Sequence, residues 1–176
     1  AISFQGACKT KEEVDAIWAK LSEKGKVLME LGTYPFSERY GWTQDRFGLS
    51  WQIMYVGDAP VTQKITPVMM FVGAVCGKAE EAMRAYTSIF KNSEIRNVMR
   101  YGASDAPDKE GTVKYADFSL EGQKFGVMDS AHKHDFVFNE SVSFIAHCEN
   151  QEELDRYWEK LSAVPEAEQC GWLKDA

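Results

Sequence analysis

Residues 41–53 read Gly-Trp-Thr-Gln-Asp-Arg-Phe-Gly-Leu-Ser-Trp-Gln-Ile, and this stretch decides the fold. A polar turn separates two arms that each carry a tryptophan, and Gly48 supplies the special backbone angle that such a turn needs. The pattern predicts a β-hairpin. Its beginning recurs near the other end of the chain, where residues 170–175 read Cys-Gly-Trp-Leu-Lys-Asp. The recurrence indicates an internal repeat.

The repeat extends to the segments that precede each copy of this motif. Residues 2–22 and 142–162 are identical at ten of 21 positions. Each segment predicts an apolar strand followed by an amphipathic helix. Thr10 and Glu13 form a capping box in the first copy, and Asn150 replaces the threonine in the second. The chain therefore contains a duplicated structural unit.

The unit is a strand, a helix and three further strands. Residues 1–58 follow this βαβββ order, and residues 64–130 repeat it with little sequence identity. Residues 140–176 begin a third copy that stops before its last strand. The polar segments 102–111 and 130–139 are predicted to be loops. We predict an α+β fold in which repeated βαβββ half-modules form curled mixed sheets.

Each half-module has an apolar sheet face and needs a partner that covers it. We expect residues 1–58 to be the second half of an upstream unit. Residues 64–130 would be the first half of the next unit, and residues 140–176 its truncated second half. Either residues outside this sequence or a domain-swapped homodimer would complete the odd half-module.

Composition and charge restrict the class of protein and its partners. The chain has 176 residues, of which 44% are hydrophobic and 27% charged, as in globular proteins. A net charge of −7 argues against a nucleic-acid partner, because phosphate contacts need clustered Lys and Arg. No apolar run approaches the ~20 residues of a membrane helix, so we expect a cytoplasmic protein with no membrane partner. The four cysteines lack the Cys-x-x-Cys spacing of zinc-ribbon and redox sites.

Several motifs carry a resemblance to a known family. They are Ile-Thr-Pro-Val-Met-Met-Phe at 65–71, Phe-Ser-Leu-Glu-Gly-Gln-Lys-Phe at 118–125, Phe-Asn-Glu-Ser-Val-Ser-Phe at 138–144 and the motif at 170–175. Together they resemble PhnB-like proteins, often labelled 3-demethylubiquinone-9 3-methyltransferase, of the vicinal oxygen chelate superfamily. The resemblance implies the glyoxalase and bleomycin-resistance fold, in which paired βαβββ motifs curl into a cup. It also implies a dimer.

The methyltransferase label has no support in the residues themselves. A class I methyltransferase needs a Gly-rich turn after a strand, where the backbone approaches a nucleotide-like cofactor. Neither Gly-x-Gly-x-x-Gly nor Gly-x-Gly-x-Gly occurs in the chain. We therefore do not expect methyl transfer.

The resemblance also implies a divalent metal held by two His and two Glu. Metal-using relatives carry a Glu four residues after the hairpin glycine, where this chain has Gln52. The entry-strand positions expected to hold His carry Ser3, Thr66 or Pro67, and Ser143. Because a neutral amide is a far poorer ligand than a carboxylate, we expect no metal and no other cofactor.

His132 and His134 offer a different set of metal ligands. Alternate residues of an extended segment face the same way, so the two rings could form a two-nitrogen clamp. The segment is polar, and no Cys or Glu stands at ligand spacing. A solvated loop is therefore the favoured interpretation.

A concave apolar pocket is predicted inside the cup, with Gln52 as its polar anchor. Its candidate lining residues are Trp42, Trp51, Met70, Phe71, Phe125, Met128 and Trp172. The alternative places these side chains in the core between sheet and helices. Asp117 is a candidate base if its strand face points into the cup, and an ordinary surface carboxylate if it points outward.

Three functions remain open from the sequence. The first is a metal-free protein that binds a small hydrophobic or aromatic ligand. The second is a metal-dependent, glyoxalase-like lyase, isomerase or dioxygenase. The third is an assembly protein whose duplicated sheets serve only interaction. The sequence does not establish whether any reaction is catalysed.

Overall fold

The computed structural model describes residues 1–176 and divides into an N-terminal unit, residues 1–139, and a C-terminal unit, residues 140–176. The elements of the N-terminal unit follow the predicted order twice. They are β1 (Ile2–Cys8), α1 (Lys11–Ser22), β2 (Lys26–Tyr34), β3 (Ser37–Gln44), β4 (Ser50–Tyr55), β5 (Ile65–Val72), the short 3-10 helix η1 (Gly73–Val75), α2 (Ala79–Ile89), β6 (Glu94–Arg100), β7 (Val113–Leu120) and β8 (Gln123–Ser130). None of the chain's helices has the length and apolar character needed to cross a membrane.

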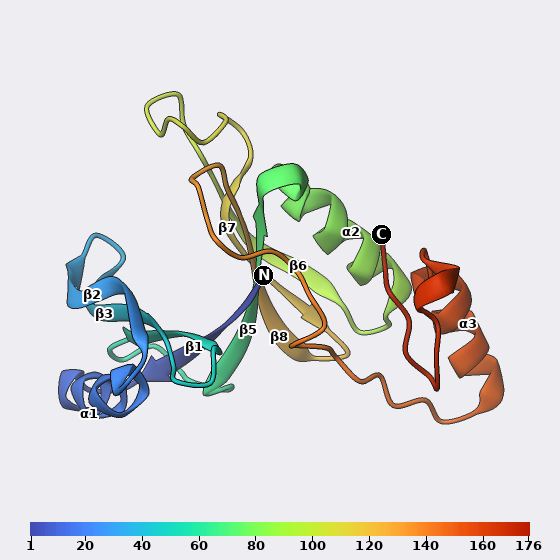
Figure 1. Ribbon diagram of the computed structural model, residues 1–176, viewed down its shortest axis with the longest axis horizontal. Coiled ribbons are helices and arrows are strands. Elements are labelled where there is room, and N and C mark those ends of the chain that lie inside the picture. Colours follow the sequence, from blue (N-terminus) through green and yellow to red (C-terminus); the bar gives the residue numbers. More distant parts are fainter. The chain divides into compact units, whose positions relative to one another are not determined.

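The eight strands form one mixed sheet in the order β2-β3-β4-β1-β5-β8-β7-β6. Within each half, the first strand pairs parallel with the last: β1 with β4, and β5 with β8. The halves join where β1 pairs antiparallel with β5. In Figure 1, α1 lies beside the first four strands and α2 beside the other four. The α+β class and the repeated βαβββ architecture are therefore confirmed.

The predicted hairpin is formed by β3 and β4, with Trp42 opposite Gln52. Its turn is held by Asp45, whose Oδ1 accepts hydrogen bonds from the backbone N–H groups of Phe47 (2.9 Å) and Leu49 (3.0 Å). Gly48 has φ +91°, a left-handed angle at which a Cβ is strained. The turn therefore depends on residues only a few positions apart.

Two hydrophobic cores pack between the helices and one face of the sheet. The first lies under α1 and is centred on Cys8, Val14 and Ile53. The second lies under α2 and includes Met69, Phe71, Ala79, Met83, Val113, Ala116, Phe118, Phe125 and Val127. Both cores use the same side of the sheet, because Gly6 on β1 is aligned with both Ile53 on β4 and Ile65 on β5. The opposite side, called here the uncovered face, has no helix of this unit packed on it.

The C-terminal unit contains α3 (Gln151–Leu161) and the 3-10 helix η2 (Pro165–Ala167). Asn150 caps α3 by accepting the Glu153 N–H at 2.9 Å, as Thr10 caps α1 by accepting the Glu13 N–H at 3.1 Å. The strand expected at residues 142–148 is not formed. A strand needs a neighbouring backbone, and no counterpart of β4 is present in residues 140–176. How this half-module is paired stays a prediction.

The ion pairs of Glu80 link α2 to β6 and predict a pH dependence of stability. Arg100 Nη1 lies 2.6 Å from Glu80 Oε2, and Arg84 Nη2 lies 2.8 Å from Glu80 Oε1. Hydrogen bonds from Arg100 and Arg84 lower the pKa of Glu80 to about 2. Because the native state binds fewer protons than the unfolded state, this stabilisation is complete above the unfolded pKa, about 4.3. It is lost as the pH falls toward 2.

We therefore expect Glu80→Gln to be less stable than wild type at pH 6, and the difference to vanish near pH 2. Urea unfolding at several pH values measures it. Glu81→Gln removes the same charge, and it serves as the control because the ion pair of Glu81 joins it to Lys78 between side chains that are 70% and 59% exposed. A gap of equal size for both variants would assign the effect to net charge and contradict the ion-pair explanation.

Candidate functional site

The uncovered face carries a row of polar side chains at the centre of the sheet. Gln5 on β1 is aligned with Gln52 on β4 and with Thr66 on β5, so the three side chains lie on one side. Gln52 is buried, and its Oε1 accepts a hydrogen bond from the Tyr40 hydroxyl at 3.1 Å. Burial raises the pKa of Tyr40, which keeps this hydroxyl protonated as a donor. The side-chain oxygen of Gln52 is therefore already engaged in a hydrogen bond with Tyr40.

A pocket of about 490 Å³ opens on the uncovered face. It is lined by Trp42, Met70, Tyr101, Ser104, Asp105, Ala106, Asp108, Met128, Ser130, His132 and His134. Trp42 lies on β3 and Met128 on β8, although β4, β1 and β5 separate these strands in the sheet. The sheet must curl for both to reach one pocket. Met70 is aligned with Met128 on the adjacent strand.

The apolar part of the pocket consists of side chains suited to a flat ring. Trp42 donates its indole N–H to Ser50 Oγ at 2.8 Å, which fixes the ring. Its ring centroid lies 6.5 Å from that of His134. Methionine thioethers are flexible and make favourable contacts with aromatic rings. Trp42, Met70 and Met128 together offer a surface for an aromatic or other apolar group.

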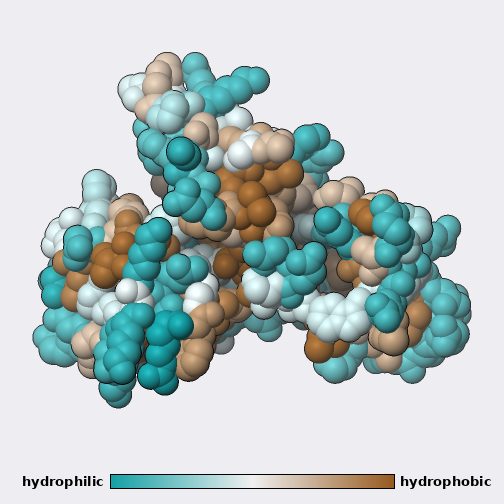
Figure 2. Space-filling view, in the orientation of Figure 1, coloured by the Kyte–Doolittle hydropathy of each residue, from teal (hydrophilic) through white to brown (hydrophobic).

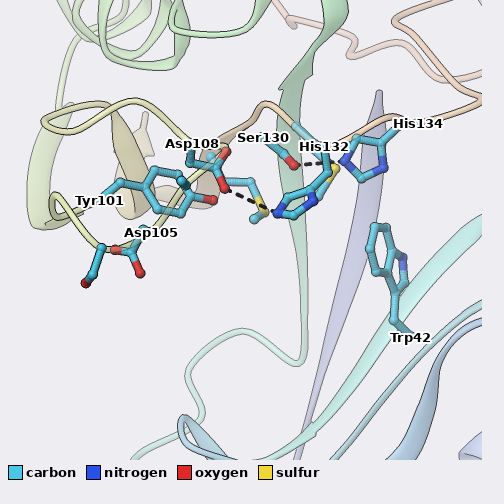
Figure 3. Close-up of a pocket in the computed structure, with 11 residues that line it drawn as sticks. Trp42, Tyr101, Asp105, Asp108, Ser130, His132 and His134 are labelled. Atoms are coloured by element: carbon cyan, nitrogen blue, oxygen red, sulfur yellow. Dashed lines mark hydrogen bonds and ion pairs between the residues drawn. The ribbon is translucent and has the colours of Figure 1, made fainter.

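The polar part of the pocket comes from the loop 101–112 and from the segment after β8 (Figure 3). Asp108 is buried, and its Oδ1 accepts the backbone N–H of Ala131 at 2.6 Å. His132 Nε2 lies 3.5 Å from Asp108 Oδ2. His134 Nε2 shares a hydrogen bond of 2.8 Å with Ser130 Oγ. Both histidines thus point to partners within the site, as the dashed lines of Figure 3 show.

Electrostatics of the site are set by burial and by a few charged groups. Burial lowers the pKa of His134, with the nearby His132 as a further cause. Burial also raises the pKa of Tyr101 to about 12, so its hydroxyl is neutral near pH 7. That hydroxyl donates to the backbone oxygen of Asp129 at 3.0 Å. His134 is therefore favoured in its neutral form, which has both a donor and an acceptor nitrogen.

Asp129 does not line the pocket, but its carboxylate holds the backbone segments next to it. Its Oδ1 accepts the N–H groups of Gly77 (2.7 Å) and Ala79 (3.2 Å), and its Oδ2 accepts that of Val113 (3.1 Å). These bonds tie the start of α2 and the start of β7 to the end of β8. Since Ser130 follows directly, Asp129 positions the chain that carries both histidines.

A second pocket of about 350 Å³ lies on the other side of the histidine segment. Its lining includes Val72, Gly73, Cys76 and Phe136 as well as both histidines. Figure 2 shows apolar side chains gathered over η1 and the start of α2, beside this pocket. Burial raises the pKa of the Cys76 thiol, which disfavours the reactive thiolate.

The structure brings only part of the predicted pocket together. Trp42, Met70 and Met128 line it, and Gln52 and Asp117 lie on the same sheet face without lining it. The other candidates do not reach it. Phe71 and Phe125 belong to the core under α2, Trp51 packs against the core under α1, and Trp172 lies in the C-terminal unit, 58% exposed.

For the candidates on strands this difference has one physical reason: neighbouring residues of a strand point to opposite faces. Trp51 is aligned with Thr43, one position from the pocket residue Trp42. Phe71 likewise follows Met70, and each pair therefore divides between core and pocket. Asp117 is aligned with Gly126 and accepts a long hydrogen bond from Asn97 Nδ2 at 3.5 Å.

Sequence reasoning missed the polar half of the pocket. Tyr101, Asp105 and Asp108 lie in or next to a segment interpreted only as a polar loop. His132 and His134 lie in a segment interpreted as solvated. The alternate spacing of the two histidines was the available signal, and both rings do line the pocket.

The residues present do not fit the metal site that the superfamily implies. Ser3, Gln52 and Thr66 offer neutral oxygens, and the Nε2 atoms of His132 and His134 face different partners, Asp108 and Ser130. No group of three or more His, Cys, Asp or Glu side chains has a metal-binding arrangement. Carboxylate and imidazole ligands are what divalent cations of this kind require.

The family model described as 3-demethylubiquinone-9 3-methyltransferase matches residues 1–54 and 63–176. The chain belongs to this PhnB-like family. Among solved structures, the PhnB protein from Bacillus cereus is 47% identical, with a TM-score of 0.51, over 56% of this chain and 73% of that one.

Two other solved structures are more distant from this PhnB-like chain. A protein from Staphylococcus aureus is 29% identical over 54% of this chain and 63% of its own, with a TM-score of 0.29. A glyoxalase/bleomycin resistance protein/dioxygenase superfamily member from Vibrio splendidus 12B01 is 9% identical over 72% and 96%, with a TM-score of 0.43. No curated protein matches the chain.

Proposed function

We propose that this PhnB-like protein binds a small hydrophobic or aromatic molecule without a metal ion. The observation that carries the proposal is the pocket formed by Trp42, Met70 and Met128 on the uncovered face, with polar groups at its rim. Ligand sites commonly combine an apolar lining with a few placed polar groups. The neutral side chains Ser3, Gln52 and Thr66 support the metal-free form of the proposal. A homodimer remains part of this proposal, as the family resemblance implies.

The two rival functions predict different pockets. A metal-dependent lyase, isomerase or dioxygenase needs oxygen and nitrogen ligands converging at ~2.0–2.6 Å from one point. An assembly protein would fill its cup with its own side chains and would bind none of the aromatic compounds in a ligand screen. Methyl transfer is not proposed, since the chain has no Gly-rich turn for a nucleotide-like cofactor.

A thermal-shift screen of aromatic compounds tests the proposal, because a ligand that binds the native state raises the melting temperature. We expect Trp42→Ala to weaken binding of a hit about tenfold, from the lost ring contact and apolar area. Phe47→Ala is the matched control, since Phe47 lies at the tip of the same hairpin and is 80% exposed. Elemental analysis of the purified protein should find no stoichiometric divalent metal. A bound metal, or binding that Trp42→Ala leaves unchanged, would contradict the proposal.

A further inference from the structure

The buried carboxylate of Asp108 is the most unusual polar group of the pocket. Its side chain is 5% exposed, and its Oδ1 is occupied by the Ala131 N–H at 2.6 Å. Its Oδ2 faces His132 Nε2 at 3.5 Å, a weak contact with a side chain that is 62% exposed. A buried carboxylate needs firm pairing to offset the loss of hydration. Asp108 Oδ2 therefore has unused capacity for a hydrogen-bond donor.

The neighbouring carboxylates do not share this property. Asp105 accepts the Gly102 N–H at 2.8 Å and pairs with Lys114 Nζ at 3.3 Å. Asp129 uses both oxygens for three backbone N–H groups. Among these carboxylates, Asp108 is thus the buried one with a weakly paired oxygen.

Burial favours the neutral form of three titratable groups near Asp108. Tyr101 has its pKa raised to about 12 and the Cys76 thiol also has a raised pKa, both mainly through burial, so neither adds charge near pH 7. His134 has a lowered pKa, again mainly through burial. The side chains next to Asp108 that can carry a charge include Asp105, which pairs with Lys114, and His132, which faces Asp108 Oδ2.

We propose that Asp108 Oδ2 binds the positively charged nitrogen of an aromatic amine whose ring lies against Trp42, Met70 and Met128. His132 Nε2 lies 3.5 Å from this oxygen, and its exposed side chain moves aside when the amine enters. An ammonium group satisfies the buried carboxylate with a charge-assisted hydrogen bond, which a hydroxyl only partly replaces. This inference rests on the proposed binding function and names its ligand class.

Three probes with the same ring and two-carbon chain test the charge preference: phenethylamine, 2-phenylethanol and 3-phenylpropionate. Calorimetric titration of the full chain at pH 7 measures their affinities. We expect the amine to bind at least about tenfold more tightly than the alcohol, the scale of a hydrogen bond to a charged group, and the carboxylate to bind weakest. Equal affinity of amine and alcohol, or tighter binding of the carboxylate, would overturn the proposal while leaving aromatic binding intact. If none of the three binds, both the inference and the binding proposal fail.

Variants assign the preference to a single side chain. Asp108→Asn should reduce the ratio of amine to alcohol affinity to within about twofold, because the charge is lost and the shape is kept. Glu110→Gln, in the same loop but exposed and outside the pocket lining, also removes one negative charge and should keep the ratio of wild type. His132→Ala should tighten amine binding, because the amine no longer has to displace the His132 side chain. Unchanged or weaker binding would contradict this competition between His132 and the amine. Where Asp108→Asn fails to fold, the wild-type ratio and His132→Ala decide the matter.

Discussion

Asp129→Asn is expected to lower the free energy of unfolding by about 3 kcal/mol, since a buried charged acceptor loses one oxygen and gains a misplaced donor. Asp129 is 1% exposed, and its two oxygens hold the N–H groups of Gly77, Ala79 and Val113. Asparagine keeps one oxygen for the first two donors. Its amide group then faces the N–H of Val113, where two donors repel and water does not reach. Urea unfolding at pH 7 measures the loss as a lower urea concentration at the unfolding midpoint. The slope of the free energy against urea concentration should stay unchanged.

Asp45→Asn provides a matched control for this effect. Asp45 has the same arrangement, with two backbone N–H groups on Oδ1 and the indole N–H of Trp51 on Oδ2 at 2.9 Å. Asp45 lies in a half-buried turn, where water can solvate the new amide. We expect its loss to be about 1 kcal/mol or less. Equal losses for both variants would contradict the assignment of the larger effect to burial.

Gly41→Ala is expected to destabilise the protein by about 2 kcal/mol through overpacking. A Cβ built at Gly41 would lie 2.5 and 2.6 Å from two ring carbons of Trp18, well inside the ~3.5 Å at which carbon atoms make contact. Trp18 is 9% exposed between α1 and the sheet, so its ring has little room to move. Thermal and urea unfolding both report the loss.

A double-mutant cycle tests whether the tryptophan ring is the cause. In a Trp18→Leu background, Gly41→Ala should cost less than about 1 kcal/mol, because the clashing ring is gone. Gly32→Ala is the control on the neighbouring strand, where the nearest atom to a new Cβ is 3.7 Å away. An additive cycle, or a Gly32→Ala loss as large as that of Gly41→Ala, would contradict the steric explanation.

The Gly41–Trp18 contact also shows what the repeat does and does not determine. The counterparts of Gly41 and Trp18 are Gly171 and Trp158, identical in type. A Cβ at Gly171 would meet no atom within 4 Å, and Gly171 has φ +86° in a turn. The glycine and the tryptophan therefore pack against each other in the N-terminal unit, where β4 completes the half-module. In residues 140–176 the corresponding strand is lacking, and the local sequence alone does not create the contact.

Within residues 1–139, the sequence by itself determined the elements and their order. Caps such as Thr10 with Glu13, the Asp45 turn and the periodicity of the apolar residues involve groups within a few positions of each other. Such hydrogen bonds and patterns can be read from neighbouring residues, and in natural sequences these local preferences agree with the global fold. For this reason the α+β class, the βαβββ units, the hairpin and the capped N-termini of α1 and α3 were predictable.

Only the tertiary structure decided which side chains form the pocket. Strand alternation separates Trp42 from Trp51 only once the register is known, and a shift of one residue exchanges the two faces. Asp108 meets Ala131 across 23 positions, and curling of the sheet brings Trp42 and Met128 to the same cavity. These relations depend on how distant backbones pair and bend, which the local pattern of residues does not specify.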